Sequence, residues 1–168
     1  MEFYLIVGLF IFLMSGTAKK PTAKSAYEIL KYDSLAQKYG SYYGIDSRLI
    51  LAIIATESGG NELAKGPTGD FGLMQITQIA LTDFNQTYGT NYSINNLFTP
   101  DINVHVGSGF LKMMIDRSKA KGLQGTDALY NAIRAYNVGL SRAGEMGFEY
   151  QKKVLAWFEI FSTLNYVS

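Results

Sequence analysis

An apolar helical pattern runs through residues 46–57 (DSRLILAIIATE) and ends at an acidic residue, after which one serine and two glycines follow. Asp46 is suited to cap the start of this helix, because its carboxylate accepts hydrogen bonds from free backbone N–H groups. Glu57 lies four residues after Ile53 and three after Ile54, and residues at this spacing share one face of a helix. The pattern therefore places a carboxylate on the inward face of a helix, at its last residue.

A carboxylate on an inward face is costly unless it is paired or its pKa rises. A raised pKa would allow Glu57 to act as a general acid near neutral pH. The alternative is an exposed glutamate at a frayed helix end. This segment alone leaves both interpretations open.

Composition excludes several function classes. The 168 residues fit one domain with a short appendage, and the hydrophobic fraction of 48% is enough for a core. No Lys/Arg block appears, so no nucleic-acid partner is expected. The chain has no cysteine, which excludes disulfides, zinc thiolates and thiol nucleophiles, and its one histidine, His105, excludes a His-rich metal site. No metal or organic cofactor is implied, and we expect His105 to have a surface or capping role without a catalytic part.

The N-terminus contains an uninterrupted apolar run, FYLIVGLFIFLM, at residues 3–14. The run is short for a transmembrane helix, although residues 3–18 would span a thin bilayer. Glu2 precedes it and Lys19 follows it, the reverse of the charge order of an exported protein. We favour an uncleaved membrane anchor. The alternatives are an atypical signal peptide cleaved after Ala18, storage in a virus-internal membrane, and a buried N-terminal helix.

The remaining chain reads as one α-rich domain with at most a small strand element. We expect an apolar segment at 1–18, a linker at 19–24 and the domain at 25–168. Gly40 is expected to stop the first helix, with a turn at 41–44. Periodicity and breakers predict helices at 25–39, 46–57, 82–88, 101–119, 127–138 and 148–164, loops at 59–69, 91–100 and 139–147, and either helix or strand at 71–76.

Four stretches, in this order, resemble the soluble lytic transglycosylase family, which has a lysozyme-like fold. They read YGID…LI.AII..ES from residue 43, GLMQI at 72–76, DINV..G..FL at 101–111 and AYNVG at 135–139. The resemblance extends from Tyr39 to Leu155. It implies a predominantly α, lysozyme-like α+β fold in a single domain, to which the apolar run adds an N-terminal apolar helix.

The resemblance also implies an activity. Family members cleave the β-1,4 bond between N-acetylmuramic acid and N-acetylglucosamine in peptidoglycan and form a 1,6-anhydro sugar. Glu57 matches the catalytic acid, which protonates the departing oxygen and then takes the proton of the muramoyl C6 hydroxyl. The same comparison implies that the residues that bind or orient the substrate and the acid are Ser58, Met74, Gln75, Tyr136 and Asn137.

The residue types leave other roles open for some of these positions. Met74 would also serve as core filling, Asn137 as a helix cap, and Tyr136 as a core residue with its hydroxyl satisfied elsewhere. Asn103 and Gly107 are expected to serve packing. The chain departs from the family pattern where it lacks a proline after GLMQ and lacks Gly-Pro-Gly after the AYN motif, which leaves the shape of the subsites open.

Asp70 stands where the family generally has a small residue. If it points at the site, it would activate a water molecule together with Glu57, making the protein a hydrolytic muramidase. A solvated loop position for Asp70 is the favoured alternative. A third hypothesis is a non-catalytic peptidoglycan-binding module, which would not need Glu57, Gln75 and Tyr136.

We therefore predict a membrane-associated peptidoglycan lytic transglycosylase. It would be tethered through residues 3–18 and would act on the cell wall in the periplasm, opening the mesh for a larger envelope-penetrating assembly. Candidate assemblies are a phage genome-entry apparatus, with the protein in the virion membrane, and a conjugation or secretion channel. The unusual charge order around the apolar run favours the phage virion.

Overall fold

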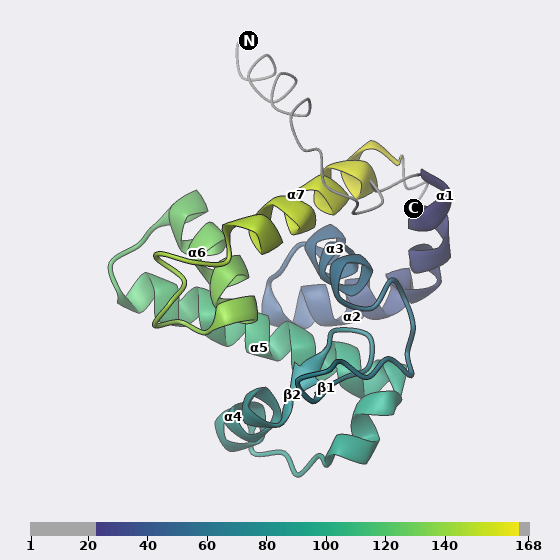
Figure 1. Cartoon of the computed structure of the whole chain (residues 1–168), viewed down its shortest axis with the longest axis horizontal. Helices are drawn as coiled ribbons and strands as arrows, with labels where there is room; N and C mark the ends of the chain where they lie inside the picture. Colours follow the sequence, from purple (N-terminus) through teal and green to yellow (C-terminus); the bar gives the residue numbers. More distant parts are fainter. Residues whose placement is uncertain (1–22, 165–168) are drawn as a thin grey trace.

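The computed structural model describes residues 23–164, which form a mostly helical domain with one small hairpin (Figure 1). The predicted fold class is confirmed. Residues 1–18, predicted as an apolar helix, and most of the predicted linker lie outside the described residues.

The elements are α1 (Ala23–Ile29), a 3₁₀ turn η2 (Leu30–Tyr32), α2 (Asp33–Tyr43), α3 (Ser47–Glu57), β1 (Asp70–Phe71), β2 (Ile76–Thr77), α4 (Gln78–Tyr88), the 3₁₀ segment η3 (Ile94–Phe98), α5 (Pro100–Ala120), α6 (Gly125–Val138) and α7 (Phe148–Thr163).

Helix α3 is the buried centre of the domain. Every residue from Leu49 to Ala55 is buried, as expected of a helix that is apolar on all sides. It packs against α1, α2 and α7, and Figure 1 shows α7 crossing on one side of it and α2 on the other. The Asp46 side chain accepts a hydrogen bond from the backbone N–H of Arg48, which confirms the predicted N-cap. The packed helix holds Glu57, its last residue, in a fixed place.

The prediction that Gly40 stops a helix is wrong, and so is the predicted turn at 41–44. Helix α2 continues through Gly40 to Tyr43 and ends at Gly44, which adopts a left-handed conformation with φ 66°. Gly40 serves close packing instead, because a Cβ atom there would lie 2.6 Å from the Ile45 carbonyl oxygen. This contact folds the start of α3 tightly back on α2.

The segment at 71–76, left open between helix and strand, forms most of a tight antiparallel hairpin. Asp70 pairs with Thr77, and Phe71 pairs with Ile76. The turn is fixed by Asn103, which is fully buried on α5. Its Oδ1 accepts from the Met74 N–H (2.8 Å), and its Nδ2 donates to the carbonyls of Phe71 (2.9 Å) and Leu97 (2.8 Å). Asn103 was expected to serve packing. In the structure its buried side chain holds the base of the turn by hydrogen bonds.

The remaining helices lie close to their predicted positions. Helix α5 runs from Pro100 to Ala120, one residue beyond the prediction at each end. Helix α4 begins at Gln78 rather than Thr82, because the Thr77 hydroxyl accepts from the Ala80 N–H and caps it there. Helix α6 begins two residues early, and α7 ends one residue early.

The predicted surface or capping role of His105 is wrong. Its ring is half-buried and stacks on Tyr39 with 4.8 Å between ring centroids. Burial lowers its pKa. The rings around it come from α2, α4 and the loop before η3, namely Tyr39, Tyr42, Tyr43, Phe84 and Tyr92.

Candidate functional site

Glu57 is the last residue of α3, and hydrogen bonds of the next residues hold the turn that follows it. The Ser58 N–H donates to the Ile54 carbonyl (3.1 Å), and the Ser58 hydroxyl accepts from the Gly60 N–H (3.1 Å). Gly60 has a φ of 80°, and its carbonyl accepts a 2.9 Å hydrogen bond from the Tyr32 hydroxyl. These contacts turn the chain away directly after Glu57 and leave its carboxyl at the helix end.

The Glu57 carboxyl has the protonation behaviour of a general acid. Burial raises its pKa from 4.5 to about 7. The hydroxyl of Tyr150 donates a 2.6 Å hydrogen bond to Oε1, which acts in the opposite direction by stabilising the ionised form. The negative charge of Asp70 adds a smaller upward contribution to the pKa. The carboxyl can therefore lose and regain a proton near neutral pH.

Tyr150 is a site residue that the sequence reasoning missed. It lies in the first turn of α7, a helix whose start was predicted correctly but to which no site role was assigned. A signal was present, because Tyr150 stands four residues before Val154 and eleven before Phe161, both fully buried. This spacing places it on the inward face of α7, where α7 packs on α3. Burial raises the pKa of its phenol well above the usual range, so the phenol stays a donor.

Tyr136, in the last turn of α6, reaches the site from a third helix. Its hydroxyl donates a 2.9 Å hydrogen bond to the Met74 carbonyl. Its pKa is raised well above the usual range, first by burial and then by the charge of Glu57, so the phenol and the carboxyl lie within electrostatic reach. The ring packs edge-on against Phe110 at 5.5 Å. The geometry links the hairpin turn to α6 beside the acid.

Met74 and Gln75 occupy the hairpin turn. The Met74 side chain is fully buried and packs against Gly107, where an added Cβ would lie 2.4 Å from its sulfur. Its backbone carbonyl is the part that Tyr136 contacts. The Gln75 backbone has a φ of 47°, and its amide donates to the carbonyls of Gly72 (2.8 Å) and Ala64 (3.3 Å). In this structure the Gln75 amide thus braces the turn and the preceding loop.

Three of the predicted substrate-binding residues line one cavity of about 230 Å³. They are Gln75, Tyr136 and Asn137, and the Asn137 side chain is exposed. The rest of the lining is mostly apolar, with Phe110 and Ile76 included, and Arg142 adds a positive charge. The hollow lies between the hairpin, α4, α5 and the end of α6, on the Tyr136 side of the site.

Asp70 lies in β1 and is half-buried. The Thr68 hydroxyl donates a short hydrogen bond to its carboxylate, which anchors it in the loop. Its charge nevertheless acts on the pKa of Glu57. The structure therefore places a second carboxylate within electrostatic range of the acid.

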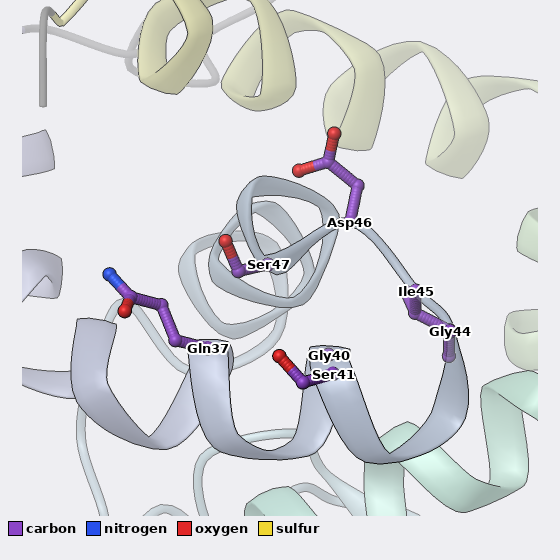
Figure 2. Close-up of a pocket in the computed structure, with 7 residues that line it drawn as sticks. All are labelled: Gln37, Gly40, Ser41, Gly44, Ile45, Asp46 and Ser47. Atoms are coloured by element: carbon purple, nitrogen blue, oxygen red, sulfur yellow. The ribbon is translucent and has the colours of Figure 1, made fainter. Parts of the chain in front are cut away.

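A larger hollow, of about 340 Å³, lies away from this site. It is formed where the end of α2 meets the start of α3, and Figure 2 shows Gln37, Ser41 and Ser47 projecting from these helices. Asp46 lines it at the N-terminal end of α3, whereas Glu57 stands at the opposite end of the same helix. An 11-residue helix is roughly 16 Å long, which separates this hollow from the acid.

Comparison with known proteins gives consistent matches. A model of the transglycosylase SLT domain matches residues 34–155. Membrane-bound lytic murein transglycosylase C of Sodalis glossinidius is 35% identical over 112 residues, which cover 65% of this chain and 31% of that protein. The protein of the same name from Pectobacterium atrosepticum is 36% identical over 112 residues, with the same coverage. The chain thus spans about a third of the length of these relatives.

Solved structures share the fold. An inactive mutant of lytic transglycosylase Slt from Pseudomonas aeruginosa superposes with a TM-score of 0.69 at 19% identity, over 79% of this chain and 24% of that one. The 70 kDa soluble lytic transglycosylase from Escherichia coli gives a TM-score of 0.68 at 23% identity, with the same coverage. A complex of the 70 kDa soluble lytic transglycosylase with bulgecin A also matches, with a TM-score of 0.69.

Proposed function

Because the chain belongs to the transglycosylase SLT domain family, we propose that it is a peptidoglycan lytic transglycosylase. It cleaves the β-1,4 bond between N-acetylmuramic acid and N-acetylglucosamine and leaves a 1,6-anhydro end. The observation that carries the proposal is the Glu57 carboxyl, half-buried at a helix end, bonded to Tyr150 and with its pKa raised by burial to about 7. A carboxyl in this state is suited to a reaction that needs an acid and then a base.

Glu57 performs both proton transfers. Protonated Glu57 gives its proton to the glycosidic oxygen as the bond from C1 of the muramoyl residue breaks. The C6 hydroxyl of the same sugar attacks C1 and gives its proton to the ionised Glu57, which restores the acid. The departing sugar gains one proton, the anhydro ring forms within the muramoyl residue, and no water is consumed. One carboxyl therefore suffices where most glycosidases use two.

The surrounding groups favour this cycle. The Tyr150 hydroxyl stabilises the carboxylate that exists between the two transfers. Tyr136 holds the hairpin turn through the Met74 carbonyl, and Ser58 holds the turn after the acid. We assign Gln75 and Asn137, which line the same cavity, to substrate contact, and Met74 to contact through its backbone.

A hydrolytic muramidase is the second candidate, and one observation favours it. The charge of Asp70 reaches Glu57, and a hydrolase that uses two carboxyls needs the second one close to the acid. In that reaction Asp70 would take a proton from a water molecule that attacks C1. The Thr68 hydroxyl opposes this role, because it donates to Oδ2 of Asp70 and so occupies one of the two oxygens that would accept the proton of the water.

Digestion of purified peptidoglycan in ¹⁸O-water, read by mass spectrometry, tests the proposal. Anhydro-muropeptides without label, absent with Glu57→Gln, are expected. Labelled reducing ends would overturn it in favour of the hydrolase, and Asp70→Asn would then abolish the product. A folded protein that binds bulgecin A or glycan strands without cleaving them would favour a binding module. Tyr27→Phe, a change on the exposed face of α1, is the matched control for expression and folding.

We also propose that residues 3–18 tether the domain to a membrane, so that it opens the cell wall locally for an envelope-penetrating assembly. Support comes from the apolar run and from the membrane-bound relatives. Within residues 23–164, no helix is long and apolar enough to cross a bilayer. The phage virion remains the favoured assembly because of the order of charges around the apolar run.

Fractionation of the 168-residue chain and of a chain lacking residues 1–18 tests the tether, and only the former is expected to sediment with membranes.

A further inference from the structure

The first turn of α7 has no cap of its own, although it carries Tyr150. The helix starts at Phe148 after Gly147, which adopts a left-handed conformation with φ 82° and supplies no side-chain hydrogen bond to the helix. Uncapped first turns leave N–H groups without partners and fray readily. A hydroxyl that must stay 2.6 Å from a carboxyl needs this turn to be held in another way.

Arg134 of α6 supplies contacts to both sides of Tyr150. Its Nε donates to the Ala143 carbonyl (2.6 Å) in the loop before α7, and its Nη1 donates to Oε1 of Gln151 (2.6 Å) in the helix. Its guanidinium carbon lies 4.6 Å from the centre of the Phe148 ring, a cation–π distance. The planar fork of arginine makes these contacts at once, which a lysine ammonium does not reproduce.

Gly147 brings the loop against the backbone of the same residue. A Cβ atom at Gly147 would lie 3.0 Å from the Cβ of Arg134 and 3.2 Å from its carbonyl oxygen. The loop, the first residue of α7 and the residue after Tyr150 are therefore all in contact with Arg134. Phe148 is 46% exposed, so its own burial holds this turn weakly, and its contact with the Arg134 guanidinium adds to that hold.

We infer that Arg134 is a positioning residue: it holds the first turn of α7 against α6 and thereby sets the Tyr150 hydroxyl on the Glu57 carboxyl. Arg134 itself does not touch the reacting atoms. Tyr150 from α7 and Asp70 from β1 act on the Glu57 carboxyl, and the charge of Glu57 acts in turn on Tyr136 from α6. The catalytic consequence rests on the proposed function, whereas the positioning itself does not.

The pKa of Glu57, followed by NMR on ¹³C-carboxyl-labelled glutamate, reports the position of Tyr150 without any need for turnover. The Glu57→Gln spectrum assigns the signal. Tyr150→Phe removes a hydrogen bond to the ionised form and is expected to raise the pKa of Glu57 by about one pH unit. Arg134→Met, which keeps the aliphatic stem, is expected to raise the pKa in the same direction by about half as much.

The double variant separates positioning from a direct charge effect. In a Tyr150→Phe background, Arg134→Met is expected to add no further rise, because its effect passes through the hydroxyl. A further rise in the double variant would overturn the inference. So would a folded Arg134→Met protein whose Glu57 titrates as in the wild type.

Two further variants complete the design. Gln151→Met removes only the acceptor of Nη1 and is expected to raise the pKa of Glu57 slightly, and it decides the question if Arg134→Met does not fold. Arg134→Lys is expected to raise the pKa of Glu57 nearly as much as Arg134→Met does, because lysine keeps the charge but lacks the planar guanidinium. Arg117→Met is the matched control, because Arg117 also joins two helices, through Asp83 on α4, and should leave Glu57 unchanged.

Activity then separates this inference from the proposed function. If the wild type forms anhydro products, the alkaline limb of kcat/KM should move upward in Arg134→Met together with the pKa of Glu57. If the wild type forms no product, the proposed function fails, while the NMR titration still decides the role of Arg134.

Discussion

The Tyr150 hydroxyl lies 2.6 Å from the Glu57 carboxyl, although 93 residues separate the two in the chain. The contact joins the end of the most buried helix to the start of the last one. Burial of the carboxyl and donation from the phenol act on its pKa in opposite directions, and burial dominates. The acid therefore keeps its proton near neutral pH and still has a partner when ionised.

Tyr150→Phe should lower turnover while moving the alkaline limb of the pH profile upward. The ionised acid loses its donor in the middle of the reaction, so kcat is expected to fall by about 10- to 100-fold. The carboxyl keeps its proton to higher pH because the bond that favoured its ionised form is gone. Initial rates of anhydro-muropeptide release between pH 5 and 9 check both effects. A fall in rate with an unmoved limb would contradict the role given to Tyr150.

Stability should decrease as the pH rises through the pKa of Glu57. This carboxyl is raised from 4.5 to about 7 in the folded protein, so its contribution is full below 4.5 and is lost between 4.5 and 7. The loss should reach about 3 kcal/mol above pH 7. Urea unfolding of the wild type and Glu57→Gln across this range tests it. His105 titrates in both proteins, so its contribution cancels when one profile of unfolding free energy against pH is subtracted from the other. Parallel profiles would refute the prediction.

Asn103→Ala should destabilise the hairpin turn and with it the site. The substitution leaves one N–H and two carbonyls without their partner, at a fully buried position. Unpaired buried groups cost about 1 to 3 kcal/mol each, so a loss of about 3 kcal/mol or more is expected. Chemical denaturation measures it, and Asn95→Ala at an exposed position is the control. A loss below that of the control would show that the turn does not depend on Asn103.

Gly40→Ala should destabilise the packing of α2 on α3. The new Cβ would meet the Ile45 carbonyl oxygen at 2.6 Å, and backbone cannot move aside cheaply. A loss of about 1 to 3 kcal/mol is expected. Gly144→Ala is the matched control, since nothing lies within 4 Å of its added Cβ. Thermal unfolding of the pair checks the prediction, and equal midpoints would contradict it.

Local pattern was enough to predict most helices. Helix α5 has a long periodic apolar face, α3 has an unbroken apolar run, and Asp46 marks the start of α3 that the structure confirms. The prediction for Gly40 was wrong because the local sequence does not show whether a glycine ends a helix or allows another segment to pack closely against it. His105 was misread because its stacking partners come from other elements, such as Tyr39 of α2.

The site was predictable to the extent that it consists of short motifs. The positions of Glu57 and Tyr136 followed from the helices that carry them, and the structure brings both within electrostatic reach of each other. The Tyr150 contact required the packing of α7 on α3, which no local pattern contains. The Gln75 amide points to the Gly72 carbonyl because of a left-handed backbone that the sequence did not reveal.

The separation of Glu57 from Tyr150 along the chain also bears on the timing of biosynthesis. A nascent chain that has emerged from the ribosome only as far as α6 holds Glu57 without α7, the helix that covers α3 and donates to the carboxyl. Such a chain lacks the Tyr150 donor and the cover of α7, both of which act on the Glu57 carboxyl in the folded protein. The acid site is therefore complete only after nearly all of the described part of the chain has been made.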